Sequence, residues 1–462
     1  MDTSILRKRL AEVKKAIAQQ HQISEELLDQ EKVIQLQLDN TIYPILTIPP
    51  EITCKIFIQC VPSKAGNHHP TLAPLLLLRV CSAWRTIALS TPSLWSTLHL
   101  DMTQRSTVPN RQALENRIRS WLEYAGGCPL SLTLRGWNFS TWGPCPFPAI
   151  ITRYASQLRH LDAKMRPANF RLRDIAEFPL LQTLTIHCFT HPSDVTLNDH
   201  TPITAWRTAP KLLEITFERQ CNRFLHPECL PWNRLTTINC TVRLKADECL
   251  AMVRWAPLLI RLVISPCSTS VNRPLFSHSR LESLTISRHG NPDILRFLGV
   301  PILRSLRLLY WRDLTDESFI PFLSRSPALR MLTCHTSRRS LKALRTLTQL
   351  TDLELFETPY VDDHEQLSTA ALFMLDRERE PDTLPHLKSV TLSNWGKEVD
   401  ERVIQALHSR RVAQEGGAKL QAFRAFHENQ PMRINEDQIP HLRRFVAEGM
   451  KIHIGSNAVN LL

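Results

Sequence analysis

The chain has 462 residues, of which 43% are hydrophobic and 22% are charged, and 56 basic against 44 acidic residues give a net charge of +12. These values exclude an intrinsically disordered chain, and the length exceeds what one ordinary globular core accommodates. Only 12 residues are glycine, and neither GxGxxG nor GxxxxGKS/T occurs, which excludes the usual glycine-rich nucleotide loops.

Segments that direct a chain to a membrane are not found. The first residues, MDTSILRKRL, are charged and lack the apolar core of a secretory signal. The most apolar run, residues 72–80, contains Pro74 and Arg79 and is too short to span a bilayer. Twelve cysteines are scattered without CxxC spacing, which is typical of buried thiols in a reducing compartment. We therefore expect a cytoplasmic or nuclear protein, or one found in both compartments, with no membrane partner.

Residues 4–40 are predicted to form one helix that stops before Pro44. Its apolar residues are spaced by four and three, in the order Leu6, Leu10, Val13 and Ile17, and later Leu27, Ile34 and Leu38. Gln20, Ser24 and Glu31 interrupt this seam. A coiled coil fits the pattern, and a docked or lone helix fits it equally well. We assign residues 1–41 to this N-terminal helix.

The segment 42–98 is predicted to hold three short helices. Pro50 suits a first helical turn, and the stripe of Ile52, Ile56 and Cys60 follows it. A second helix is predicted to begin near Pro74, with two apolar stripes about 100° apart. A third follows Ser90 or Thr91 as its cap. Three short helices cannot bury this much apolar surface among themselves. The periodicity does not decide whether another protein or the downstream part of this chain covers it.

A repeated pattern dominates the rest of the chain. First, residues 111–124 predict a helix ended by Gly126 and Gly127, and 129–137 predict a strand, ahead of a proline-rich loop at 138–149. From residue 150 the pattern LxxLxL recurs eleven times, with first leucines at 158, 181, 212, 235, 259, 281, 303, 329, 350, 387 and 420. Most steps are 21 to 26 residues, the length that leucine-rich repeats need for a strand and a return. Cys240 and Cys334 fall on inward strand positions.

The chain lacks the motifs of common enzymes. GxSxG, HExxH and the kinase motifs do not occur, so no catalytic residue and no cofactor is predicted. His187, Cys188 and His191 could bind a metal, as could the acidic residues around His364 (Asp362, Asp363 and Glu365). We favour a strand end and a loop at the first place and a polar loop at the second, without metal at either. The basic cluster 337–345 is interpreted as a solvated helix face rather than a nucleic-acid site, since no aromatic residues alternate with it.

Three motifs in the helical segment resemble an F-box. They are I-P-P-E-I at 48–52, V-C-S-A-W at 80–84 and P-S-L-W at 92–95, against the usual L-P-x-E-I, V-C-x-x-W and a terminal small-L-W. Ile48 stands where Leu is usual, and the loop 63–71 is longer than usual. Residues 42–140 are similar to the F-box-like proteins of mushroom-forming fungi, and the repeats extend the resemblance.

This resemblance implies a fold and a partner. It implies an F-box at 42–99, a linker with a helix and a strand at 100–149, and an α/β leucine-rich-repeat solenoid at 150–462. F-box proteins bind the adaptor Skp1 and through it a cullin–RING ubiquitin ligase. The residues that match the motif and its apolar faces, and that we expect at the Skp1 contact, are Ile48, Pro49, Ile52, Ile56, Leu76, Val80, Cys81 and Trp84.

We therefore expect a substrate-recognition subunit of an SCF-type ubiquitin ligase that is not itself an enzyme. The repeats would hold a protein target, and aromatic residues beside charges are typical binding hot spots. The residues expected there are Arg307, Tyr310, Trp311, Asp352, Glu354, Phe356 and Trp395, although each aromatic could instead pack a repeat edge. The alternative is a non-ligase interaction scaffold. A basic nucleic-acid-binding repeat protein is the less favoured third reading.

Overall fold

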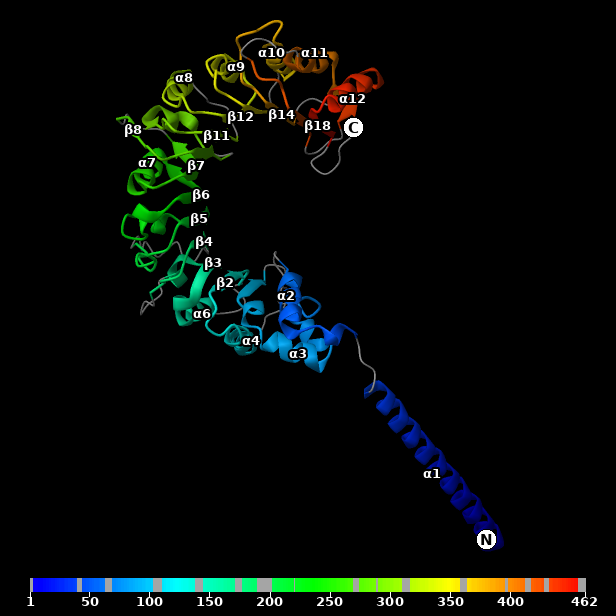
Figure 1. Ribbon diagram of the computed structural model, residues 1–462. Coiled ribbons are helices and arrows are strands. Elements are labelled where there is room, and N and C mark those ends of the chain that lie inside the picture. The colour runs from blue at the N-terminus through cyan, green and yellow to red at the C-terminus, as the bar shows by residue number, and fades with distance from the viewer. Residues whose placement is uncertain are drawn as a thin grey trace. The chain divides into compact units, whose positions relative to one another are not determined.

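A computed structural model of the chain describes most of its residues in two compact units, residues 1–95 and 96–462 (Figure 1). The described residues are 3–39, 44–62, 69–102, 110–137, 144–170, 177–188, 202–219, 221–268, 274–287, 290–309, 316–357, 364–394, 398–411, 417–427 and 432–455. The two units are described separately below.

The first unit is helical. Its long N-terminal helix, α1 (Thr3–Asp39), agrees with the predicted helix at 4–40. The shorter elements are η1 (Pro44–Thr47), α2 (Pro50–Cys60), η2 (Leu77–Arg79), α3 (Ser82–Leu89) and η3 (Pro92–Leu94). Pro50 and Pro92 each open a helix, where the missing N–H of proline costs no hydrogen bond.

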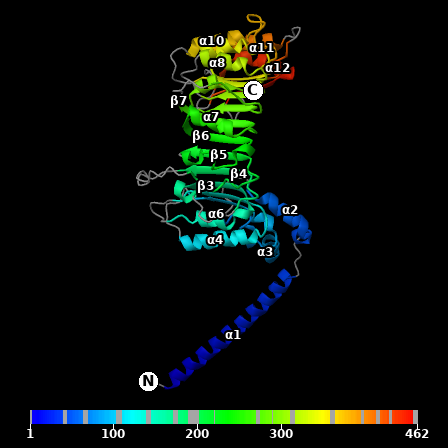
Figure 2. The same cartoon turned by 90° about the vertical axis from the view of Figure 1, so that its left-hand side faces the viewer.

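The second unit is built on a fourteen-stranded sheet whose strands lie in chain order (Figure 2). Every strand pair in it is parallel, so the structure is α/β in this unit. The strands are β1 (Thr97–Asp101), β2 (Leu130–Arg135), β3 (Leu158–Met165), β4 (Thr183–Cys188), β5 (Glu214–Arg219), β6 (Thr237–Lys245), β7 (Arg261–Ser268), β9 (Ser283–Ile286), β11 (Ser305–Leu308), β12 (Met331–His335), β13 (Asp352–Phe356), β14 (Ser389–Ser393), β16 (Ala422–Phe426) and β18 (Lys451–Gly455).

Helices connect these strands and lie along one side of the sheet (Figure 1). They are α4 (Arg111–Tyr124), α6 (Phe147–Arg153), α7 (Ala246–Trp255), α8 (Asp316–Ser324), α9 (Arg338–Leu344), α10 (His364–Leu375), α11 (Glu401–Arg411) and α12 (Ile439–Ala447). Two small parallel pairs accompany them, β8 (Phe276–Ser277) with β10 (Leu298–Gly299), and β15 (Glu398–Val399) with β17 (Arg433–Ile434). Short 3-10 turns complete the connections: η4 (Ala155–Gln157), η5 (Pro167–Phe170), η7 (Asn222–Phe224), η8 (Trp232–Arg234), η9 (Pro292–Phe297) and η10 (Glu436–Gln438).

The core follows from the register of the strands. The second leucine position of the repeated pattern aligns from strand to strand, for example Leu161 with Leu184 and Leu332 with Leu353. These side chains are buried, as are the first leucines such as Leu158 and Leu350. Because strand side chains alternate between faces, the leucines point into the core and the residues between them point to the opposite face. The pattern therefore gives the sheet one buried, apolar face and one polar face.

All eleven predicted repeat strands are confirmed, and so are the helix at 111–124 and the strand within 129–137. The sheet, however, begins before the predicted boundary at residue 150, because β1 and β2 are its first two strands. Leu98 and Leu100 alternate as buried residues in β1 without the leading leucine of the full pattern. The last strand, β18, was not predicted, because Gly449 stands where the pattern has its first leucine and only Ile452 and Ile454 remain of it.

A buried arginine ties α11 to the end of α10. Arg410 is 1% exposed, and its guanidinium donates hydrogen bonds to the backbone carbonyls of Leu375, Thr383 and Leu384 at 2.6, 2.9 and 2.8 Å. Burial lowers its pKa to about 10. Leu375 is the last residue of α10, and Thr383 and Leu384 lie in an irregular segment, so the side chain supplies donors to carbonyls at a helix end and outside regular structure.

All twelve cysteines are free thiols, and six of them are buried. Cys240 and Cys334 are at most 2% exposed, which confirms their predicted inward positions. Burial raises the pKa of each of these two thiols to about 12. Over the part of the chain that the structure describes, no helix combines the length and the apolarity that a membrane crossing requires.

Candidate functional site

Helix α2 has a buried stripe and an exposed apolar stripe side by side. The carbonyl of Pro49 accepts the N–H groups of Ile52 and Thr53 at 3.0 Å each, which starts the helix. Thr53 and Phe57 are 6% and 1% exposed. One residue earlier in each case, Ile52 and Ile56 are 46% and 45% exposed, since one residue turns a helix by about 100°. The exposed stripe is thus held in place by its buried neighbour.

The buried stripe of α2 packs on α3 and η3. The ring of Phe57 meets the ring of Trp84 edge to face, with 4.9 Å between centroids. The Cys54 thiol and the Thr91 hydroxyl are hydrogen-bonded at 3.0 Å. Trp84 is half-buried by this packing, and its backbone is part of α3. These contacts fix α2 against the helices that carry the second motif.

The segment from Pro74 to α3 differs from the predicted single helix. The 3-10 turn η2 ends at Arg79, and Cys81 is extended, with φ −157° and ψ 171°. The sulfur of Cys81 accepts the N–H of Trp84 at 3.5 Å and so caps the start of α3. The prediction of one helix from Pro74 was wrong because cysteine is not a usual capping residue, so no residue near Cys81 indicated the break.

Most of the residues expected at the Skp1 contact are accessible. Pro49 and the four aliphatic residues Ile52, Ile56, Leu76 and Val80 are exposed, whereas Ile48, Cys81 and Trp84 are half-buried. Leu76 and Val80 are 43% and 53% exposed, while Leu77 between them is 4% exposed. Leu72, at 39%, is a further exposed aliphatic residue that the motif did not indicate. We call Ile52, Ile56, Leu72, Leu76 and Val80 the exposed aliphatic set.

A second candidate surface is a polar row across β11 to β14. The register aligns Arg307, Thr333, Glu354 and Thr391 on the face opposite the leucines. The Glu354 carboxylate accepts hydrogen bonds from the Thr333 hydroxyl at 3.0 Å and from the Ser393 hydroxyl at 2.9 Å. The Arg307 guanidinium lies 4.0 Å from the same carboxylate. The row therefore has a fixed carboxylate at its centre and a half-exposed cation at one end.

The structure brings together some of the residues expected to bind a target. Arg307 and Glu354 are neighbours, and Phe356 contacts His335 edge to face at 5.6 Å between ring centroids. Asp352 accepts a hydrogen bond from the hydroxyl of Thr351 at 2.6 Å. The remaining three expected residues, Tyr310, Trp311 and Trp395, lie outside the described residues.

Sequence reasoning missed a charged network on β2 to β5. Arg135 forms a two-pronged ion pair with Asp162, whose carboxylate lies 3.2 Å from Nε2 of His187. Nδ1 of the same ring lies 2.8 Å from the carboxylate of Glu218. Burial raises the pKa of Asp162, but His187 and Arg135 outweigh it, so the pKa lies below its ordinary value. Only His187 and Glu218 occupy the same position on neighbouring strands. Asp162 is aligned with Thr133 and Thr185, two residues before Arg135 and His187, so the sequence offered only a weak signal for this network.

These contacts account for one of the candidate metal sites. His187 is 6% exposed and faces two carboxylates on the polar face, while Cys188 alternates to the buried face. A hydrogen bond with Cys221, and then burial, raise the pKa of Cys188, which disfavours the thiolate. His191 lies outside the described residues, as do Asp362 and Asp363 of the other candidate. Within the described ranges, no group of three or more ligating side chains is arranged to hold a metal ion.

The basic cluster at 337–345 forms α9 and its ends. Ser337 caps the helix by accepting the N–H of Ser340 at 3.1 Å. Arg345 forms an ion pair with Glu380, which lowers the pKa of that carboxyl. Leu341 and Leu344 are buried, and α9 lies between its neighbours α8 and α10.

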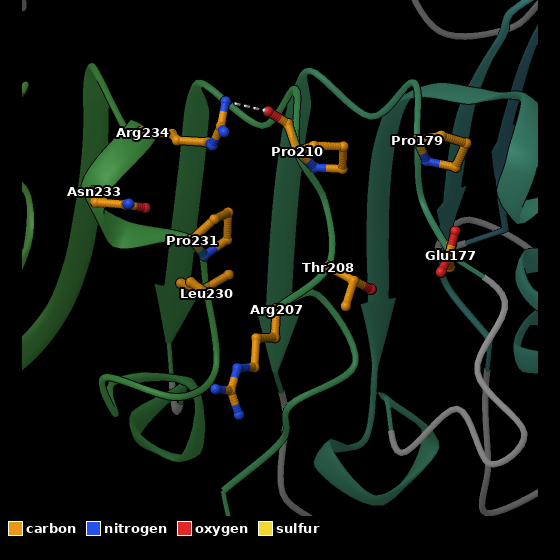
Figure 3. Close-up of a pocket in the computed structure, with 9 residues that line it drawn as sticks. All are labelled: Glu177, Pro179, Arg207, Thr208, Pro210, Leu230, Pro231, Asn233 and Arg234. Carbon is orange, nitrogen blue, oxygen red and sulfur yellow. Dashed lines mark hydrogen bonds between the residues drawn. The ribbon is translucent and has the colours of Figure 1, made fainter.

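An open pocket of about 430 Å³ lies over the segments that lead into β4, β5 and β6 (Figure 3). Its lining combines prolines with charged and polar residues: Glu177, Pro179, Arg207, Thr208, Pro210, Leu230, Pro231, Asn233 and Arg234. Arg234 is turned toward the Pro210 carbonyl and donates to it at 3.2 Å, while Arg207 points away from that pair. The lining includes neither histidine nor cysteine, and Glu177 is its one acidic side chain.

Comparison with known proteins adds no family to these observations. No protein-family model matches the chain, and no curated protein is significantly similar to it. The inference of function therefore depends on two surfaces of the molecule: the exposed aliphatic set in the first unit and the polar row in the second.

Proposed function

We propose that this protein is a substrate-recognition subunit of an SCF-type ubiquitin ligase. Residues 42–99 would be its F-box, and the exposed aliphatic set would contact a Skp1-like adaptor. The second unit would be a leucine-rich-repeat solenoid that holds a protein target, which places the protein in the cytoplasm, the nucleus or both. In this proposal the chain carries no active site and needs no cofactor.

The observation that carries the proposal is the pairing of stripes on α2. Ile52 and Ile56 keep 46% and 45% of their surface exposed beside a stripe that is almost fully buried. Isolated exposed aliphatic residues are common on proteins, but the five of the exposed aliphatic set, with Ile58 as a sixth within residues 52–80, are typical of an interaction surface. The motifs I-P-P-E-I and V-C-S-A-W contain Ile52 and Val80, and Ile56 and Leu76 each lie four residues from a motif, which favours an adaptor of the Skp1 type.

The proposed mechanism is proximity. An adaptor bound to the first unit would connect the chain to a cullin–RING ligase, while the polar face of the second unit held the target. A target lysine would then meet the ligase-bound ubiquitin carrier at high effective concentration. The polar row around Glu354 supports this division, because its hydrogen-bonded carboxylate and half-exposed Arg307 can pair with charges on a partner.

Co-precipitation with a purified Skp1-type adaptor tests the proposal. The full-length wild type should retain the adaptor, and an Ile52→Asp, Ile56→Asp double variant should not, because it places two carboxylates in the contact. Ile58→Asp is a matched control, since Ile58 is 39% exposed but lies on the other side of α2. Failure of the wild type to retain the adaptor, or equal retention by the wild type and the double variant, would contradict the proposal.

A non-ligase scaffold is the second candidate. It is favoured by α1, a 37-residue helix whose described side chains are exposed and could assemble a larger complex. Purification of the tagged protein from cells separates the two candidates. A complex that contains both the adaptor and a cullin supports the ligase subunit, whereas one with the adaptor and no cullin supports the scaffold.

A further inference from the structure

Helix α1 presents a long apolar seam that no other described residue of the chain covers. All residues from Thr3 to Leu38 are exposed, and the seven apolar seam residues are each 50–59% exposed. They are Leu6, Leu10, Val13, Ile17, Leu27, Ile34 and Leu38. At 1.5 Å per residue the helix is about 55 Å long. A helix of this length gains stability mainly by burying such a seam against another helix.

The seam follows the a and d positions of a heptad repeat. The d positions are Leu6, Val13, Gln20, Leu27 and Ile34, and the a positions are Leu10, Ile17, Ser24, Glu31 and Leu38. Apolar residues occupy seven of these ten positions, and the three polar residues lie in the middle and in the C-terminal half. Whatever covers the seam must therefore accommodate Gln20, Ser24 and Glu31.

Charge divides the helix into two halves. Residues 3–20 contain five basic residues and one acidic residue, a net charge of +4. Residues 21–38 contain four acidic residues and one basic residue, a net charge of −3. The N-terminal half is therefore complementary in charge to the C-terminal half. A second copy of the helix places opposite charges side by side only if it runs in the opposite direction.

The seam itself selects the same direction. In an antiparallel pair centred on residue 22, Leu6 meets Leu38 of the second copy, Leu10 meets Ile34, and Ile17 meets Leu27. Gln20 then meets Ser24, so these two polar residues pair with each other. This register leaves two mixed layers, related by the two-fold symmetry, in each of which Val13 of one copy meets Glu31 of the other. Lys14 follows Val13 and lies beside that carboxylate.

A parallel pair of the two helices does not allow these favourable contacts. It would place Glu31 opposite Glu31 within the seam, where two carboxylates repel and lose their water. At the flanking positions, Arg9 would face Lys14 of the second copy. Both N-terminal halves would also carry the same positive charge. The parallel arrangement is therefore disfavoured at three separate places along the helix.

We propose that α1 is a self-association site that joins two copies of this chain through an antiparallel coiled coil. The interface is isologous, so it closes at a dimer. The two copies bring two adaptor surfaces and two polar rows into one assembly. The residues involved differ from those of the proposed adaptor contact, so the two proposals can fail independently.

Sedimentation equilibrium of the full-length protein tests the association. The wild type should be a dimer, and an Ile17→Asp, Leu27→Asp variant should be a monomer, with its dissociation constant raised at least about a hundredfold. These residues contact no other described part of the chain, so the melting temperature of the rest should not change. Adaptor retention by this variant should equal that of the wild type. A monomeric wild type, or a variant that still dimerises, would overturn the proposal.

Introduced cysteines test the direction. Antiparallel pairing places residue 6 of one copy beside residue 38 of the other, whereas parallel pairing places residue 6 beside residue 6. A mixture of Leu6→Cys and Leu38→Cys proteins should therefore form, on mild oxidation, a disulfide between the two introduced thiols, and mass spectrometry of peptides should identify it. The Leu6→Cys protein alone should not link its two introduced thiols. A link between residues 6 of two copies, or none between residues 6 and 38, would overturn the antiparallel arrangement.

Discussion

Two consecutive residues of α2 should respond to truncation in opposite ways. Ile56 is 45% exposed and belongs to the proposed adaptor contact, whereas Phe57 is 1% exposed and packs on Trp84. Ile56→Ala should weaken adaptor binding and lower the free energy of unfolding by only about 1 kcal/mol, for the half of the side chain that is buried in the fold. Phe57→Ala should instead lower the free energy of unfolding of the first unit by about 3–5 kcal/mol, as is usual for a buried aromatic.

The size of the binding effect follows from the exposed area. Full burial of an isoleucine side chain stabilises by about 1.5–3 kcal/mol. Since about half of Ile56 is already buried, the adaptor can cover only the other half, which is worth about 0.7–1.4 kcal/mol. Ile56→Ala should therefore raise the dissociation constant about three- to tenfold. The Ile52→Ala, Ile56→Ala double variant should raise it about ten- to a hundredfold.

Isothermal titration of full-length variants with the purified adaptor measures these constants, and urea denaturation of the same samples measures stability. Ile58→Ala is the control, because it removes the same atoms from an exposed site on the other side of the helix. Its dissociation constant should stay within about twofold of wild type. If the double variant binds like the wild type, or if Ile58→Ala weakens binding as much, the exposed stripe is not the contact.

Three further predictions concern the second unit. Asp162→Asn should destabilise the protein at neutral pH. Because the folded-state pKa of Asp162 is lowered, the stability difference between wild type and variant should have its full size above about pH 4 and should shrink as the pH falls further. Arg410→Met should cost about 3 kcal/mol or more in urea denaturation, since three buried carbonyls lose their donors. Maleimide should label the exposed Cys60 and Cys267 in the native protein but spare Cys334, whose pKa burial raises to about 12.

A specific result would contradict each of these three predictions. A stability difference for Asp162→Asn that is unchanged down to pH 2 would show that its charge is not involved. An Arg410→Met protein as stable as the wild type would mean that water or a rearranged backbone satisfies the carbonyls. Rapid native labelling of Cys334, identified by mass spectrometry of peptides, would contradict its burial.

The sheet was predictable because its signal is periodic. Each LxxLxL segment marks one strand, and eleven repetitions make a chance match implausible. Strands that lack the full pattern were harder to predict. Strand β1 has only the alternation of Leu98 and Leu100, and β18 has only that of Ile452 and Ile454. Two alternating residues are too few to separate a strand from a loop in a sequence.

The candidate sites were predictable only in part. Exposure of Ile52 and Ile56 could be expected from a stripe too wide for one partner, and the structure finds both exposed. The break at Cys81 could not, because it depends on a sulfur that accepts a backbone N–H. The ion pairs of His187 also escaped prediction, since they join residues of successive strands, and only the register decides which side chains meet.

Chain-ordered pairing in the sheet gives the second unit a particular response to force. Each strand of the fourteen is hydrogen-bonded only to strands that are next to it in that order, and every pair is parallel. A force applied to both ends of this unit therefore acts first on a terminal strand, and the detachment of that strand releases it with its connection before the next strand bears the force. Under tension this unit should unfold in a series of small steps, one strand at a time, and not in a single event.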